Sequence, residues 1–538
     1  MNQIPLEFYT NENTRYESEL NTVQKELRLL SLIRFLAFAS TVFCVYYFLG
    51  DSKTMLISVG LGGIFFSFFL KRYWKKKEEK ERLFSLIKIN SLEIDLIQGD
   101  VSKLSSGDEF KNPKHSFSFD IDLFGVGSFF QVVNRTVTKE GTEKLVSLLG
   151  SNEIDQINEK QEAIKELSAL PKWRQEFSAL GNSVEVEVAP KEISAWIKNH
   201  KKSLPDYNKW LPILFSLFSL LLILGTSFFN ISFTFVIIWF FIGLGFSGVF
   251  VKKVNDLYLR AGKVKATFQQ YYKLLEVLEQ KEFSSNLLKG KHGALLTEAK
   301  KSSALMQEFF GYLNALDQRN NIIFALFGNG LLLWDLKQTY RIEKWMDANR
   351  ENVEDWFEVI SFFDAQNSLA NYVFNHPEFI FPVIVDQGGV IDAANLGHPL
   401  LSVDNRVSSD CLIDQNGFFI VTGANMAGKS TFLRTVSLSI IMSNIGLPVC
   451  AEQMKYKPIQ LITSIRNSDS LSDDTSYFFS ELMRLKYIVE ALKHNNYFIV
   501  LDEILKGTNS TDKAEGSQKF VEKLLRSKAT GIIATHDL

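Results

Sequence analysis

The chain has 538 residues and a formal net charge of -2, with 59 lysines and arginines against 61 aspartates and glutamates. At roughly 150 residues per domain, this length predicts three or four units, each large enough for a core. The charge balance excludes a chain-wide positive field that would attract nucleic acid, so any DNA contact must be local. Cys44, Cys411 and Cys450 are far apart and show no disulfide or CxxC pattern, which favours a reducing, intracellular setting.

Four uncharged, apolar runs follow in the first half of the chain. Residues 35–50 and 54–70 are separated by a short polar break, and each is near the lower limit of about 17 residues for crossing a membrane. Arg34 is expected to extend its guanidinium to the membrane surface. Residues 210–229 and 231–251 are longer, and at about 1.5 Å per residue each spans about 30 Å. The sequence therefore predicts four transmembrane helices in two hairpins, at residues 29–71 and 209–253.

Basic residues flank both hairpins. They are Lys71, Arg72, Lys75, Lys76 and Lys77 after the first, Lys201, Lys202 and Lys209 before the second, and Lys252 and Lys253 after it. The positive-inside rule then predicts a multi-pass protein of the inner (cytoplasmic) membrane with both termini in the cytoplasm. Residues 1–28 are expected to form a polar N-terminal tail without a cleavable signal peptide. The alternative is that the apolar runs are core helices of a large soluble protein, although such helices are seldom uncharged on every face.

The polar segments between and after the hairpins predict helical domains. Residues 72–208 form a cytoplasmic segment, in which the pattern around Asp120 and Asp122 predicts a short strand or a turn before a helix. Residues 254–390 show helical periodicity, and lever arms and an ordinary helical bundle fit it equally well. Asn375-His376-Pro377 and Gly388-Gly389 then break the helices, which places a domain boundary near residue 390.

A phosphate-binding motif follows this boundary. Apolar residues 418–421 predict a buried strand, residues 423–430 match G-x-x-x-x-G-K-[ST], and a helical pattern begins at once. In this order the glycines let backbone N–H groups face phosphate oxygens, and the helix N-terminus adds its dipole. Lys429 is expected to bridge the β- and γ-phosphates of ATP, and the Ser430 hydroxyl to coordinate Mg²⁺.

Two further apolar strands end in polar side chains. Residues 497–501 lead into Asp502 and Glu503, and residues 531–535 lead into His536. Asp502 is expected to hold the hydration shell of Mg²⁺, and Glu503 to act as the catalytic base on the attacking water. His536 would hydrogen-bond the γ-phosphate or the water. The alternative for Asp502 and Glu503 is that they are solvated acids at the end of a strand, and the alternative for His536 is a structural role. Three such strands together favour catalytic roles for Lys429, Glu503 and His536.

These motifs, with GHP at 397–399, IGLPVCAEQ at 445–453, SYFFSEL at 476–482 and LDEILKGTNSTD at 501–512, resemble the MutS family of ABC-type ATPases. Residues 119–150 and 363–374 resemble the helical core of that family more weakly. The resemblance implies an α/β P-loop ATPase domain at residues 391–538 beside an α-helical core, and a homodimer formed through the ATPase domains, in which Ser476 of one subunit contacts the nucleotide of the other. The expected ATP-binding residues are Gly423, Ala424, Asn425, Met426, Ala427, Gly428, Lys429, Ser430 and Thr431, with Ser476 in trans.

The sequence departs from the family pattern at several places. Ala424, Ala427 and Lys506 stand where the family commonly has Pro, Gly and Arg. The N-terminal part carries no DNA-reading domain with a Phe-x-Glu wedge, so DNA binding is possible but mismatch recognition has no residues to support it. The chain stops soon after Thr535, before the last strand and the dimer-sealing helices of the family, and a truncated C-terminus is therefore expected.

The sequence as a whole predicts a membrane-anchored MutS-like ATPase that hydrolyses Mg-ATP at a composite dimer site and moves helical arms. A membrane-tethered mismatch-repair or DNA-binding protein is one alternative. An ABC-like membrane machine is another, although the apolar runs contain no charged residue of the kind that marks a substrate path. A nucleotide-dependent scaffold with little turnover is the third.

Overall fold

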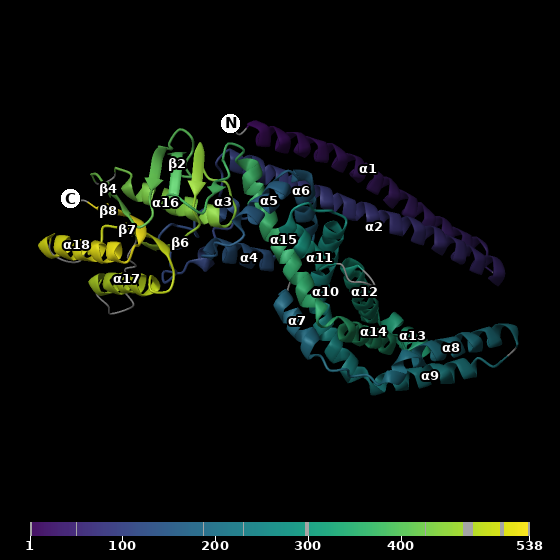
Figure 1. The fold of residues 1–538 in the computed structure, drawn as a ribbon. Coiled ribbons are helices and arrows are strands. Elements are labelled where there is room, and N and C mark those ends of the chain that lie inside the picture. Colours follow the sequence, from purple (N-terminus) through teal and green to yellow (C-terminus); the bar gives the residue numbers. More distant parts are fainter. Residues whose placement is uncertain are drawn as a thin grey trace.

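The computed structural model describes residues 3–49, 51–184, 186, 188–229, 231–295, 301–424, 427–465, 477–505 and 510–535. The protein is largely helical. Two β-sheets lie at one end, a helical body fills the middle, and two helical arms extend from the body away from the sheets (Figure 1). The predicted combination of an α/β domain with an α-helical core is therefore present.

The first arm is an antiparallel pair of long helices, α1 (Gln3–Tyr47) and α2 (Ser52–Ile97). Residues 3–28, which belong to the predicted polar tail, supply the first half of α1. Every seventh side chain there is buried, at Tyr9, Tyr16, Val23 and Leu30. A repeat of this period keeps one helix face on its partner, as in a coiled coil, and the helix forms because this narrow apolar seam packs on α2 and the body.

The second arm consists of α8 (Leu211–Phe228) and α9 (Thr234–Val249), and α9 is followed by α10 (Val251–Glu279) after a bend of 66°. By length and composition, one described helix, Ile4–Tyr47, could cross a membrane, and the bent pair α9 and α10 is a second if it counts as one span. The four predicted transmembrane helices are thus not all found as such. The bend shortens α9, and the apolar helix within α8, Leu211–Thr226, is also short.

The helical body surrounds α15 (Asn352–Asn375). This helix packs against helices that precede the second arm in the sequence and against α10, which follows it. The other body helices are α3 (Phe129–Val133), α4 (Lys139–Gly150), α5 (Ile157–Ser168), α6 (Pro171–Gly181), α7 (Pro190–Asn199), α11 (Asn286–Gly293), α12 (Ser302–Asp317), α13 (Ile322–Leu332) and α14 (Trp334–Asn349). Residues around Asp120 and Asp122 form turns before α3, so the turn rather than the strand is present there.

The two sheets have different topologies. A mixed sheet has the order β1 (Val383–Ile384), β5 (Gln453–Tyr456), β2 (Ile391–Leu396), β3 (Ser409–Ile413). The second sheet has the order β4 (Phe418–Thr422), β8 (Thr530–Thr535), β7 (Tyr497–Asp502), β6 (Gln460–Ser464), and all its pairs are parallel. Its connecting helices are α16 (Lys429–Asn444), α17 (Tyr477–Ala491) and α18 (Ser510–Arg526).

Candidate nucleotide site

The carboxyl ends of three parallel strands meet at one edge of the second sheet. In the register of the strands, Thr422 of β4 lies beside Thr535 of β8, and Asp502 of β7 lies beside Ala534 of β8. Ligands of open α/β sheets bind outside the carboxyl ends of the strands. The sequence motifs at 423–430 and 502–503, which are far apart along the chain, are thereby brought to the same edge.

The loop after β4 turns sharply into α16. Gly428 is the residue before the first helical turn and has a φ of 87°, in the left-handed region where other residues lose about 1–2 kcal/mol. The backbone N–H of Ala427 donates to the carbonyl of Ala424 across the turn. The N-terminus of α16 therefore faces the loop, as phosphate binding requires. Thr431 is exposed on the first turn of α16.

Lys429 is largely buried beneath this loop. Its Nζ donates to the carbonyl of Gly423 at 2.7 Å and to that of Ala424 at 3.4 Å. The ammonium group thus lies within the curve of the loop, where phosphate oxygens would replace the two carbonyls as its acceptors. These contacts hold the lysine charge inside the loop.

Ser430 and Asp502 are in direct contact. The hydroxyl of Ser430 donates to Oδ2 of Asp502 at 2.7 Å, across 72 positions of the sequence. Both residues are at least partly accessible at the sheet edge. A hydroxyl and a carboxylate are hard oxygen ligands of the kind that Mg²⁺ takes, so this pair fits the ion predicted for it.

Glu503 follows the end of β7 in an unusual backbone conformation. Its φ is 48°, which costs a residue other than glycine about 1–3 kcal/mol and is concentrated at functional sites. Its N–H donates to the carbonyl of Ala534 at 3.0 Å. Two residues on, the N–H of Leu505 donates to Oε1 of Glu481, a buried carboxylate of α17. Glu481 therefore fixes the turn that carries Glu503, a role that the SYFFSEL motif alone did not reveal.

Four predicted site residues lie outside the described residues. They are Asn425 and Met426 of the loop, Ser476 and His536. His536 follows directly on Thr535, the last residue of β8, whose end is at the same edge as Asp502. The structure thus describes Gly423, Ala424, Ala427, Gly428, Lys429, Ser430, Thr431, Asp502 and Glu503 of the predicted set.

The segment before α3 docks on this same sheet. Oδ2 of Asp120 accepts from the Thr463 hydroxyl at 2.6 Å and from the N–H of Ile465 at 3.2 Å. Arg484 of α17 donates to the carbonyls of Thr463 and Ser116. The sequence predicts only a short strand or a turn around Asp120, because no local pattern shows that this residue reaches the end of β6.

His398, in the GHP motif, lies near the start of the domain. Burial, aided by the positive charges of Arg434 and Arg406, lowers its pKa to about 4. Nδ1 of the imidazole accepts from the N–H of Leu400 at 3.3 Å, which requires an unprotonated nitrogen. His398 is therefore neutral at physiological pH.

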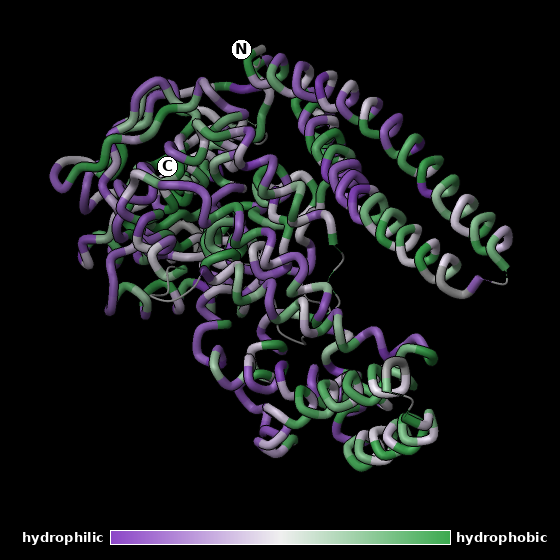
Figure 2. Tube along the Cα trace, turned by 90° about the vertical axis from the view of Figure 1, so that its right-hand side faces the viewer, coloured by the Kyte–Doolittle hydropathy of each residue, from purple (hydrophilic) through white to green (hydrophobic). Residues whose placement is uncertain are grey.

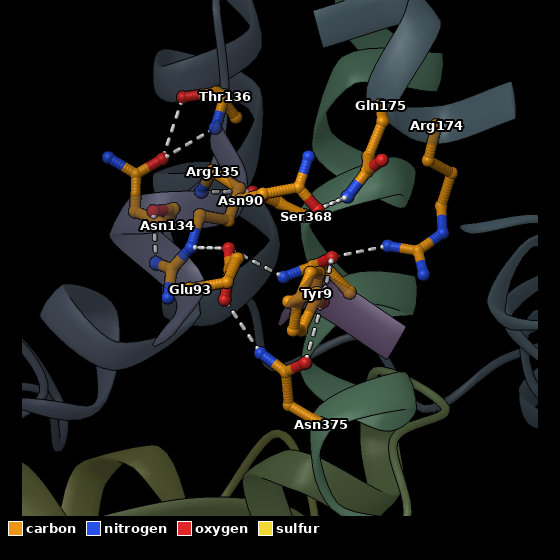
Figure 3. Close-up of polar contacts among 11 residues, drawn as sticks. Tyr9, Asn90, Glu93, Asn134, Arg135, Thr136, Arg174, Gln175, Ser368 and Asn375 are labelled. Carbon is orange, nitrogen blue, oxygen red and sulfur yellow. Dashed lines mark hydrogen bonds and ion pairs between the residues drawn. The ribbon is translucent and has the colours of Figure 1, made fainter. Parts of the chain in front are cut away.

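A buried polar cluster joins the first arm to α15 (Figure 3). Glu93 of α2 accepts from Arg135 at 2.5 Å, from Asn371 at 3.0 Å and from Asn375 at 2.8 Å. The hydroxyl of Tyr9 donates to Asn375 at 2.8 Å. Asn375 is the last residue of α15, so the base of the first arm is tied to the point where the helical body meets the sheets.

A parallel sheet that brings a phosphate loop and an acid-ending strand to one edge defines the class of P-loop nucleotide-binding domains. Residues 419–538 match the family model described as MutS domain V. Over this part the chain is similar to the MutS family.

Known proteins are similar to part of this chain. It is 31% identical over 176 residues to the MutS protein homolog 4 of Homo sapiens, covering 32% of this chain and 18% of that protein. It is 32% identical over 203 residues to the DNA mismatch repair protein MutS of Finegoldia magna, covering 36% and 23%. It is 33% identical over 141 residues to the Endonuclease MutS2 of Thermus thermophilus, covering 26% and 18%. The chain thus spans about a fifth of the length of these relatives.

Proposed function

We propose that this chain is a membrane-anchored MutS-like ATPase, which binds and hydrolyses Mg-ATP and couples the reaction to movement of its helical arms. The observation that carries the ATPase proposal is the contact between Ser430 and Asp502, which unites the phosphate loop and the acid-ending strand. Kinship with the MutS family supports it.

Each site residue has a distinct role in this proposal. Lys429 neutralises the β- and γ-phosphates, Ser430 and Asp502 hold Mg²⁺, and the ion would supply charge to the phosphates and the leaving group. Glu503 orients and deprotonates the attacking water, and its strained backbone holds the carboxylate at the strand end. His536 assists at the γ-phosphate. The second subunit closes the site with its segment around Ser476.

The test is Lys429→Ala in the full chain. Lys429 is a charged donor, and its two hydrogen bonds to phosphate oxygens would be worth roughly 3 kcal/mol together. Without them, ATP binding or turnover should fall roughly 100-fold. Lys455→Ala removes an exposed lysine of β5 as a matched control and should leave both unchanged. Normal nucleotide affinity together with normal hydrolysis in Lys429→Ala would end the proposal.

The apolar ends of both arms support the membrane proposal. Large side chains there stand exposed, among them Phe35 (66%), Phe43 (66%) and Phe241 (63%), and such surfaces mark contact with a membrane or a partner. Arg34 lies over the ring of Tyr73 at 4.4 Å and Lys77 over that of Trp74 at 4.9 Å. Aromatic and basic residues of this kind gather at membrane surfaces.

Both arms point away from the sheets, and their apolar parts lie toward the tips (Figure 2). One bilayer could therefore take both hairpins while the ATPase domain stays in the cytoplasm. Carbonate washing should leave the protein in the membrane pellet, since it strips proteins held by charge alone. Release into the supernatant would favour the alternative of exposed helices that bind a soluble partner.

A DNA-directed role is the second candidate, and the name of one relative favours it, since the protein of Finegoldia magna is called a DNA mismatch repair protein. With a net charge of -2 and no Phe-x-Glu motif in residues 1–150, any binding should be weak, salt-sensitive and indifferent to mismatches. Gel shift with matched and mismatched duplexes, with and without ATP, tests this. A clear preference for the mismatch would make DNA repair the better proposal.

A further inference from the structure

Helix α13 (Ile322–Leu332) is a third apolar element beside the second arm, outside both predicted hairpins. It contains no charged residue. It packs on α9 at backbone distance, because a Cβ added to Gly243 would lie 2.3 Å from the carbonyl oxygen of Gly330. Close approach through small residues is how helices pack within membranes, where apolar side chains gain nothing by leaving lipid.

Side-chain hydroxyls of α8 donate hydrogen bonds to the carbonyl groups at the C-terminal end of α13. The hydroxyl of Ser219 donates to the carbonyl of Leu331 at 2.7 Å, and that of Ser216 to the carbonyl of Leu332 at 3.3 Å. Trp239 of α9 in turn donates to Ser219 at 2.9 Å. Backbone groups at a helix end otherwise rely on water, so these hydroxyls provide the partners that a water-poor environment requires.

The residues that flank α13 at its two ends pair with each other on the side of the helical body. Arg319, just before the helix, pairs with Asp335, just after it, at 3.2 Å, and both side chains are mostly buried. Asn321 caps the first turn, and Asn329 accepts from the N–H of Asp335. A helix of 11 residues is about 16 Å long, roughly half the thickness of a hydrocarbon core. The segment therefore cannot cross a membrane.

One face of α13 is apolar and exposed, and Ile322 (81%), Ile323 (66%) and Phe327 (54%) lie on it. The Phe327 ring meets that of Phe240 of α9 at 5.7 Å between centroids, which joins this face to the apolar surface of the second arm. We propose that α13 is a third membrane-embedded element, which enters and leaves the bilayer on the side of the helical body and presents this face to lipid acyl chains. The inference rests on the proposed insertion of α8 and α9.

Lipid is the occupant that the surroundings favour. The face is continuous with an apolar hairpin, it carries no polar side chain that would recognise a protein partner, and the Arg319–Asp335 pair stands where the apolar surface ends. The position also matters for coupling, because α13 leads through Leu333 directly into α14 and then α15. A membrane contact at α13 is thus joined to the helix that ends at the sheets.

The test is spin labelling of the full chain in liposomes, with Cys44, Cys411 and Cys450 replaced. Single cysteines at Ile323 and Phe327 report on α13, one at Phe241 reports on α9, and one at the exposed Asp347 reports on water. Oxygen concentrates in the bilayer, whereas a neutral nickel chelate stays in water. Labels at Ile323 and Phe327 should collide with oxygen several-fold more often than with nickel, as at Phe241, and Asp347 should show the reverse.

Each other outcome has a distinct meaning. Nickel contact at Ile323 and Phe327, with oxygen contact at Phe241, would overturn the inference and leave the membrane anchor standing. Nickel contact at all three positions would defeat the anchor as well. Protection of Ile323 and Phe327 from both reagents would overturn the lipid assignment in favour of a protein, either a second copy of this chain or a partner, that covers the face.

Discussion

Removing the carboxylate of Glu93 should strongly destabilise the protein. Glu93 is 2% exposed and accepts from Arg135, Asn371 and Asn375. Glu93→Ala leaves the Arg135 guanidinium, whose side chain is 11% exposed, without its counter-charge. Breaking a buried ion pair from one side costs about 3–5 kcal/mol, because the remaining charge stays desolvated. Two amides also lose an acceptor, so the loss of unfolding free energy should lie toward the upper end of that range.

Urea unfolding of the full chain in detergent, followed by tryptophan fluorescence, measures this loss. Glu81→Ala is the matched control, because Glu81 lies on the same helix, is exposed, and faces Lys77 at 3.9 Å; it should change stability by less than about 1 kcal/mol. Adding Arg135→Leu to Glu93→Ala should recover part of the loss, since no unpaired charge remains. A loss below about 1 kcal/mol in Glu93→Ala would refute the reasoning.

Two further predictions concern the proposed ATPase domain. Glu503→Gln keeps the shape of the side chain but not its basicity, so the ATP-loaded dimer should accumulate. A bulky residue at Ser476 should instead prevent closure and leave ATP binding intact. Sizing in detergent with ATP separates the two variants, and a wholly monomeric Glu503→Gln protein would contradict the composite site. Because the pKa of His398 is lowered to about 4 from 6.5, its neutral form stabilises the fold above pH 6.5, and about 2–3 kcal/mol should be lost as the pH falls from 6.5 to 4. His398→Gln should flatten that part of the stability profile, and an unchanged profile would show that the histidine does not titrate there.

The phosphate loop and the acid-ending strand could be predicted from sequence because each is a local pattern with a defined chemistry. Parallel pairing then brings Ser430 and Asp502 together, although no local pattern fixes the strand order. Glu481 and Asp120 escaped the prediction for the opposite reason. Their roles depend on contacts with Leu505 and Thr463, which are distant in sequence, and a lone carboxylate in a helix or turn carries no signal of its partner.

The apolar runs were found by composition, but the limits of their helices were not. Among the mostly polar residues of the first 28 positions, a seven-residue repeat of buried side chains begins at Tyr9 and runs to Leu30. The average composition of the segment is polar and does not indicate this repeat. The bend between α9 and α10 was also missed, because no proline marks it. The sequence does not predict α13 as a membrane element, because 11 apolar residues are too few to suggest a membrane span.

The contacts of α15 limit how ATP could move the arms. Near its middle, Asp364 accepts from the N–H groups of Val137 and Thr138, and its last residue, Asn375, belongs to the polar cluster around Glu93. Buried polar contacts of this kind do not stretch gradually, because a shift of about 1 Å leaves desolvated groups unpaired. The first arm and α15 should therefore move as one body, and a change at the sheet edge should alter their orientation toward the ATPase domain rather than the distances within the cluster. Labels on the exposed residues Thr10 and Pro377, which lie beside the cluster but outside it, should keep a constant distance on addition of ATP, while a pair between α2 and α16 should change.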